Sequence, residues 1–76
     1  MKYKTLPSPE YLKVIRAVRQ YETQYKRPPT IREIMDITGI SSTSVVRYHL
    51  GIGVERGHIE QIGADGEARN YRATEA

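Results

Sequence analysis

Two adjacent prolines near the middle of the chain, Pro28 and Pro29, constrain its fold more than any other feature. A proline cannot continue an α-helix, and it pushes the residue before it into an extended conformation. Apolar side chains recur at helical spacing on both sides of this pair. The chain must therefore divide into separate helices here, which predicts a domain built from short, packed helices.

The first helix is predicted over residues 9–25. Ser8 is a suitable N-cap and Pro9 a suitable first helical residue. Apolar side chains fall at helical spacing along this segment, and polar side chains take the other side, where a solvated face is the simplest interpretation. The apolar positions are Leu12, Ile15, Val18 and Tyr21 or Tyr25, and the polar ones are Lys13, Arg16, Arg19 and Gln20.

The second helix is predicted over residues 31–38. Thr30 and Glu33 form a Thr-x-x-Glu capping-box pattern ahead of an apolar run, and Gly39 stands where a glycine commonly ends a helix. About three residues later, Ser42 can cap a third helix. The serine cluster there is thus interpreted as a helix start, with a loop as the alternative.

On the third helix, Val46, Leu50 and Gly53 or Val54 share one face, which predicts burial. The positions that point away from that face are Ser44, Tyr48 and, less centrally, Val45 and Ile52. Gly51 and Gly53 each disfavour a helix interior by about 0.5–1 kcal/mol relative to alanine. The helix is therefore expected to weaken or bend past Leu50.

The remainder of the chain changes to strand-like residues. Ile59, Ile62 and Tyr71 favour strands, and Asp65-Gly66 is a turn signal between them. These residues predict a two-stranded hairpin over residues 58–62 and 69–73. The whole order predicts a mainly α fold with a small β-hairpin, a winged helix-turn-helix, as a single domain over residues 1–76. The helix-turn-helix would cover about residues 31–51 and the wing about residues 58–73.

Composition narrows the class of protein. The 76 residues include no cysteine, no run of about 18 apolar residues and no secretory pattern at the start, so we expect a cytoplasmic protein with no membrane partner. The formal net charge of +3 permits a nucleic-acid partner, although it is equally suited to keeping a small protein in solution.

Catalysis and metal binding find little support in the sequence. His49 and His58 do not have metal-ligand spacing with other residues, and His49 is interpreted as a partly buried packing residue. Neither a Gly-x-Gly-x-x-Gly nor a Walker pattern is present, and the serines have no evident base. We expect a protein that is not an enzyme and needs no cofactor.

Several motifs resemble the N-terminal DNA-binding domain of LexA-type repressors over about residues 6–72. They are Ser8-Pro9, "PPTIREI" at residues 28–34, "TGISSTS" at residues 38–44, "HL" at residues 49–50 and "RGHIE" at residues 56–60. The resemblance implies a transcriptional repressor domain of the SOS response that binds double-stranded DNA. It also implies a homodimer, weak or formed only on DNA, on a pseudo-palindromic operator.

The chain departs from the LexA pattern in three places. The family usually has a lysine and a leucine where Gly51 and Gly53 stand. The wing tip, residues 63–67, carries two acidic side chains that would repel phosphates. LexA repressors continue into a self-cleaving serine–lysine protease domain, which we expect to be absent from this chain, so self-cleavage is not assigned to it.

The resemblance implies that the start of the third helix reads bases, and the residues there suit that task. No acidic side chain lies in residues 42–48, hydroxyls can donate to phosphates or base edges, an arginine can bond to guanine, and a valine can contact a thymine methyl. A basic side chain opening the second helix and another entering the second strand suit phosphate contacts. The predicted DNA-binding residues are Ser42, Thr43, Ser44, Val45, Arg47, Tyr48, Arg32 and Arg69.

Each of these side chains also has a simpler explanation. Ser42 can serve as a cap alone, Val45 as an ordinary exposed valine, Arg47 as a solvated charge, and Tyr48 as a residue packed on the wing. A protein-interaction winged helix is the alternative function, with no direct base readout. In that case Val45, Tyr48 and Ile52 would form an apolar docking patch.

Overall fold

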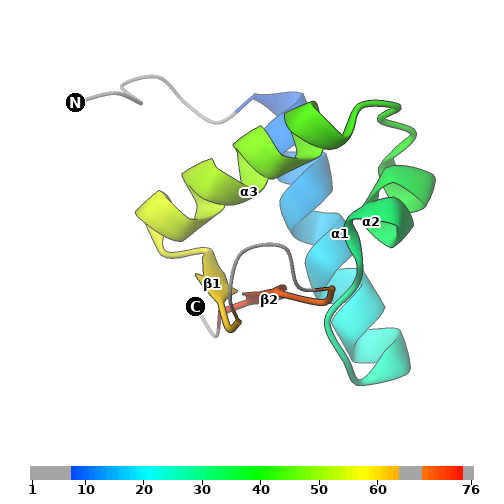
Figure 1. Ribbon diagram of the computed structural model, residues 1–76, viewed down its shortest axis with the longest axis vertical. Helices are drawn as coiled ribbons and strands as arrows, with labels where there is room; N and C mark the ends of the chain where they lie inside the picture. Colours follow the sequence, from blue (N-terminus) through cyan, green and yellow to red (C-terminus); the bar gives the residue numbers. More distant parts are fainter. Residues whose placement is uncertain (1–7, 64–67, 75–76) are drawn as a thin grey trace.

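The computed structural model describes residues 8–63 and 68–74, which form three helices followed by a two-stranded antiparallel sheet (Figure 1). In chain order the elements are α1 (Pro9–Tyr25), α2 (Ile31–Thr38), α3 (Thr43–Arg56), β1 (Ile59–Gln61) and β2 (Tyr71–Ala73). This order confirms the winged helix-turn-helix fold. The expected turn at Asp65-Gly66 and most of the acidic wing tip lie outside the described residues.

Local capping fixes the ends of α1 and α2 where the sequence predicts them. The Ser8 Oγ atom accepts a hydrogen bond from the Tyr11 backbone N–H at 3.1 Å, and Lys26 closes α1 in the left-handed conformation. The Thr30 hydroxyl accepts from the Glu33 N–H at 3.1 Å, while the Glu33 carboxylate accepts from the Thr30 N–H at 2.8 Å. This capping box satisfies two N–H groups that an uncapped helix would leave without partners.

Helix α3 continues through both of its glycines to Arg56, so it does not end at Leu50, and the weakening expected beyond that residue stays a prediction about its stability. The helix ends at Gly57, whose φ of 83° closes it in the left-handed conformation, and the helix-turn-helix therefore extends beyond residue 51. The cost of Gly53 is offset by packing, because a Cβ atom there would lie 2.6 Å from Cγ1 of Ile59. The missing side chain lets β1 lie close against α3.

The core lies where the three helices meet the first strand. Its fully buried members include Val14, Val18, Ile34, Val46 and Leu50, and Ile59 closes it from β1. Among the apolar positions predicted on α1, Ile15, Val18 and Tyr21 are buried, whereas Leu12 and Tyr25 are exposed. Ile52, expected on the outer side of α3, is buried and supplies apolar volume that Gly53 lacks.

The wing is anchored to the first helix. Strands β1 and β2 pair in the register Ile59↔Ala73, Glu60↔Arg72 and Gln61↔Tyr71. The Ala73 backbone N–H donates to the Glu22 carboxylate at 2.8 Å, and the Tyr11 hydroxyl lies 2.8 Å from Nδ1 of His58. The first bond joins β2 to α1, and the second joins α1 to His58, the residue before β1; the ribbon shows the sheet beside α1 (Figure 1).

Candidate nucleic-acid interface

The start of α3 is shaped by Ser42. Its Oγ atom accepts a hydrogen bond from the Val45 N–H at 3.3 Å, which makes Ser42 the N-cap. A hydroxyl that accepts one bond still carries a proton to donate, so capping leaves Ser42 able to bond a phosphate oxygen. The first turn of α3 contains no acidic residue, and its backbone N–H groups form the positive end of the helix dipole.

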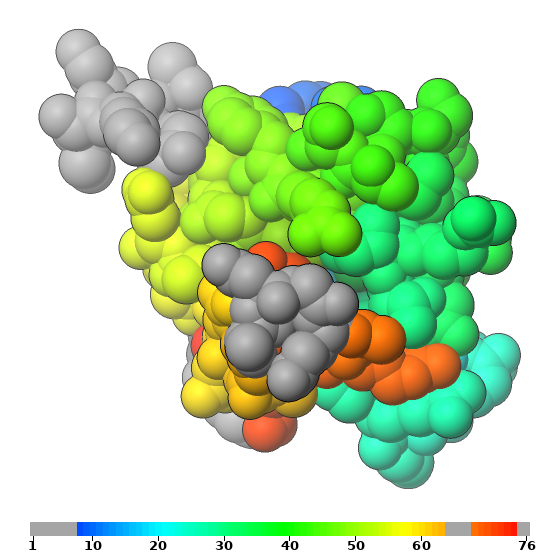
Figure 2. Space-filling model, in the orientation of Figure 1, coloured from blue at the N-terminus to red at the C-terminus, as the bar shows by residue number. Residues whose placement is uncertain are grey.

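The predicted readout residues of α3 are presented to solvent on one side of the helix. Thr43, Ser44 and Arg47 are exposed, Tyr48 is 58% exposed, and Val45 is half-buried at the edge of this face. In the space-filling view, α3 crosses the upper part of the molecule with α2 beside its first turns (Figure 2). The helix thus offers a continuous outer surface of hydroxyl, guanidinium and phenol groups.

Opposite this face, His49 holds α3 against the start of α1. It is 6% exposed, and its Nε2 atom lies 3.0 Å from a carboxylate oxygen of Glu10. The ring of Tyr48 contacts the His49 ring edge-on, with their centroids 5.3 Å apart. This arrangement confirms His49 as a buried packing residue. The Tyr48 ring contacts the His49 ring and remains exposed.

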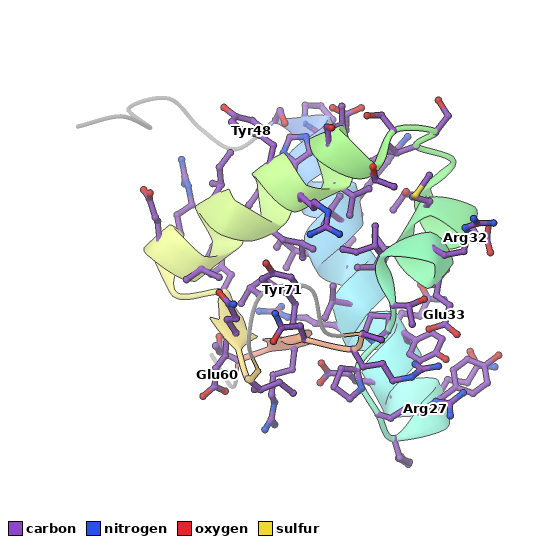
Figure 3. All side chains as sticks on the ribbon, viewed as in Figure 1. Arg27, Arg32, Glu33, Tyr48, Glu60 and Tyr71 are labelled. Atoms are coloured by element: carbon purple, nitrogen blue, oxygen red, sulfur yellow. The ribbon has the colours of Figure 1, made fainter. Side chains whose placement is uncertain are left out.

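Arg32 projects from the first turn of α2. Its side chain is exposed, and among the described residues neither Arg32 nor Arg47 takes part in an ion pair. Figure 3 shows Arg32 and Tyr48 pointing away from the fold at separate edges of the view, one from α2 and the other from α3. The structure therefore groups residues 42–48 on α3, and it leaves Arg32 as a separate basic position.

Arg69 is hydrogen-bonded within the fold, which gives it a structural role, while the DNA contact expected there stays a prediction. Its guanidinium donates to both carboxylate oxygens of Glu33, at 3.0 and 3.3 Å, and to the carbonyl oxygen of Pro28 at 2.8 Å. It also donates to the Tyr21 hydroxyl at 3.3 Å. Arg69 lies two residues before β2 and thus ties the wing to the junction of α1 and α2.

The Glu33 carboxylate is the centre of this cluster. Partial burial raises its pKa, but hydrogen bonds from the Thr30 N–H, the Tyr21 hydroxyl and the Arg69 guanidinium outweigh that effect and lower the pKa to about 2. The carboxylate therefore stays ionised under any physiological condition. The Thr-x-x-Glu pattern predicts that Glu33 caps α2. Its pairing with Arg69, 36 residues further along the chain, leaves no signal in the sequence.

Lys13 is a basic residue beside the interface that the sequence pattern assigned only to a solvated face. Together with Glu10 it borders a shallow groove of about 340 Å³ at the start of α3, which residues 38–42 and Val45 complete. The helical period of α1 does not distinguish Lys13 from Arg16 or Arg19, because it shows which side of the helix is solvated and not which other element lies nearby.

The apolar docking patch of the alternative function does not form. Ile52 is buried in the core, so Tyr48 and the half-buried Val45 are left without the third member of the patch. Within residues 8–63 and 68–74, no group of three or more His, Cys, Asp and Glu side chains is placed to hold a metal ion. None of the helices described is long and apolar enough to span a membrane.

Comparisons with known proteins agree with this geometry. The family described as "LexA DNA binding domain" matches residues 8–70. A LexA repressor from Carboxydothermus hydrogenoformans is 37% identical over 57 residues, which are 75% of this chain and 28% of that protein.

Two further LexA repressors are also similar. The protein from Corynebacterium jeikeium is 46% identical over 46 residues, 60% of this chain and 17% of its own length. The protein from Leuconostoc mesenteroides is 28% identical over 64 residues, 84% of this chain and 30% of its own length. The chain therefore spans less than a third of the length of these curated relatives.

Proposed function

The chain belongs to the LexA DNA-binding domain family, and from this premise we propose that it binds specific sequences in double-stranded DNA as a transcriptional repressor domain. Helix α3 would enter the major groove, as the recognition helix of a helix-turn-helix does. The observation that carries the proposal is the exposed start of α3, which presents hydroxyl, guanidinium and phenol groups and no acidic residue in its first turn.

The exposed side chains of α3 divide by chemistry into two kinds of contact. Arg47 can bond to the O6 and N7 atoms of guanine or to a phosphate, and Tyr48 can do either through its hydroxyl. Val45, at the edge of the face, suits contact with a thymine methyl. The hydroxyls of Ser42, Thr43 and Ser44 suit phosphates or base edges near the helix start, where backbone N–H groups also favour an anion.

Outside α3, two elements would hold the domain on the DNA backbone. Arg32 is exposed in the first turn of α2 and suits one phosphate contact. The wing would lie along the backbone beside the major groove. In this proposal Arg69 is the basic residue of the wing nearest the backbone, and its bonds to Glu33 and Pro28 also fix the wing relative to the helix-turn-helix.

The relatives are named repressors, and the proposal extends that role to this chain in the SOS response. Two copies would bind side by side on a pseudo-palindromic operator, since two-fold symmetry in the protein is mirrored by two half-sites in the DNA. A domain of this size offers little surface for a stable dimer, so pairing would depend on the DNA. The cytoplasm is the compartment that this function requires.

A salt titration tests whether the domain binds DNA through this surface. If about four to six phosphates are neutralised, log affinity should fall against log salt with a slope of roughly −4 to −5. Arg32→Ala should reduce the slope by about one, whereas Arg16→Ala, an exposed arginine on α1, serves as the matched control and should leave it unchanged. A flat salt response in the parent protein would contradict the proposal.

A further inference from the structure

The guanidinium group of Arg69 has two donor edges, and the fold occupies one of them. Its end edge, formed by Nη1 and Nη2, donates to the two carboxylate oxygens of Glu33 at 3.0 and 3.3 Å. Nη1 also donates to the Pro28 carbonyl oxygen and to the Tyr21 hydroxyl. The side edge, formed by Nε–H and the second hydrogen of Nη2, donates to no acceptor in the described part of the chain. Arg69 can therefore bind a second oxyanion without releasing Glu33.

The surroundings of Arg69 hold this guanidinium in one orientation. Its Cζ atom lies 5.8 Å from the centre of the Tyr21 ring, and its side chain is 30% exposed, so it still reaches solvent. The backbone of Arg69 has a φ of 56°, a left-handed conformation that is costly for a residue other than glycine and persists where surrounding contacts impose it. A donor fixed in this way loses little side-chain freedom when it binds a ligand.

Both members of the pair stand on elements that the proposed function assigns to the DNA backbone. Arg69 lies in the wing, two residues before β2, and Glu33 directly follows Arg32 at the start of α2. Figure 3 shows Arg32 and Glu33 projecting from this helix. In a helix-turn-helix, the first helix crosses the phosphate backbone while the second enters the groove. A phosphate is therefore the oxyanion that the side edge of Arg69 is placed to meet.

We propose that Glu33 is a positioning residue for DNA binding, which holds Arg69 so that the side edge of the guanidinium donates to a backbone phosphate. The inference deepens the DNA-binding function proposed above and rests on it. It predicts the opposite sign to simple electrostatics. A carboxylate close to phosphates repels them, so its charge alone would weaken binding, whereas a carboxylate that orients an arginine strengthens binding.

Glu33→Gln tests the proposal, because it removes the charge and keeps an oxygen that can accept from the Thr30 N–H. Affinity for the duplex that the parent protein selects from random sequences should fall by about tenfold at fixed salt, as expected when a charge-assisted hydrogen bond is lost. The slope of log affinity against log salt should become shallower by about 0.9, the value for one phosphate. Asp36→Asn is the matched control, since it removes an exposed carboxylate from the same helix. It should bind at least as tightly as the parent protein.

Arg69→Gln completes a double-mutant cycle with Glu33→Gln. It should reduce the slope by the same amount on its own, and the double variant should show no further loss, because the two residues act as one contact. Arg69→Lys keeps the positive charge but lacks a second donor edge, so it should also bind less tightly than the parent protein. That comparison does not require Glu33→Gln to remain folded.

Circular dichroism at the binding temperature establishes which variants are folded, since loss of the pair lowers stability. Parent-like or tighter binding by a folded Glu33→Gln or by Arg69→Lys would overturn the inference and leave the DNA-binding function standing. An unchanged salt slope for Arg69→Gln, or additive losses in the double variant, would do the same. Failure of the parent protein to bind any duplex would overturn both.

Discussion

Strand β1 lies so close to α3 at Gly53 that Gly53→Ala should destabilise the protein. In Gly53→Ala the new Cβ atom would lie 2.6 Å from Cγ1 of Ile59, 3.1 Å from its Cβ and 3.1 Å from Cδ1 of Ile15. Ordinary carbon–carbon contacts lie at about 3.5–4.0 Å, so Ile59 would have to recede by about 1 Å. Its Cβ is fixed to the β1 backbone, so a rotamer change alone cannot relieve the contact.

Two effects of opposite sign determine how much Gly53→Ala changes the free energy of unfolding. Forcing a methyl group into a packed core costs typically about 1–3 kcal/mol. Replacing a helical glycine with alanine stabilises the helix by about 0.5–1 kcal/mol. The packing cost is the larger of the two, and we expect a net loss of up to about 2.5 kcal/mol in the free energy of unfolding.

Urea unfolding followed by circular dichroism measures this loss as a lower midpoint at unchanged slope. Gly51→Ala is the internal control, since it makes the same chemical change two residues away in open space and should raise the midpoint. The difference between the two variants isolates the packing term from helix propensity. If Gly53→Ala stabilised the protein as much as Gly51→Ala, the close packing of α3 on β1 would be refuted.

Three further changes follow from the caps, the ion pair and the readout face. Ser42→Ala should lower the free energy of unfolding by about 1 kcal/mol in a urea titration, because α3 loses its N-cap; Ser42→Asp should restore it. Since the folded-state pKa of Glu33 lies near 2, below the ordinary 4.5, its ionisation stabilises the protein fully above about pH 4.5 and progressively less as the pH falls towards 2. Acid unfolding curves of Glu33→Gln should therefore lack that loss and show lower stability at pH 7; identical curves for both proteins would contradict the pairing with Arg69. Arg47→Ala and Tyr48→Ala should each reduce discrimination between bases by about 1–3 kcal/mol in competition binding, whereas a uniform loss on all sequences would identify a phosphate contact instead.

The helix boundaries could be predicted because short-range chemistry sets them. Ser8, Thr30 and Ser42 each cap a helix through a backbone N–H three residues ahead, and that spacing is visible in the sequence. Prolines at positions 28 and 29 separate the first two helices in the same local way. The order of the elements also follows from these local signals, and the family resemblance added the DNA-binding face.

The features that the sequence does not reveal depend on tertiary contacts. Gly53 is tolerated in α3 because of Ile59 on the wing, and helical propensity alone cannot reveal that neighbour. An arginine at the wing suits phosphates, which predicts a DNA contact for Arg69, but the sequence does not show that Glu33 and Pro28 also bind this side chain. Leu12 has helical spacing with Ile15, but the core takes Tyr11 and Val14 instead.

The central claim is that the exposed start of α3 reads the sequence of double-stranded DNA. Enrichment of random duplexes on the purified protein tests it most directly, with Arg47→Ala and Arg16→Ala carried through the same selection. We predict a pseudo-palindromic sequence for the parent protein and for Arg16→Ala, and a relaxed base preference at defined positions for Arg47→Ala. Recovery of no common sequence by the parent protein, or of the same sequence by Arg47→Ala at unchanged stringency, would contradict the account.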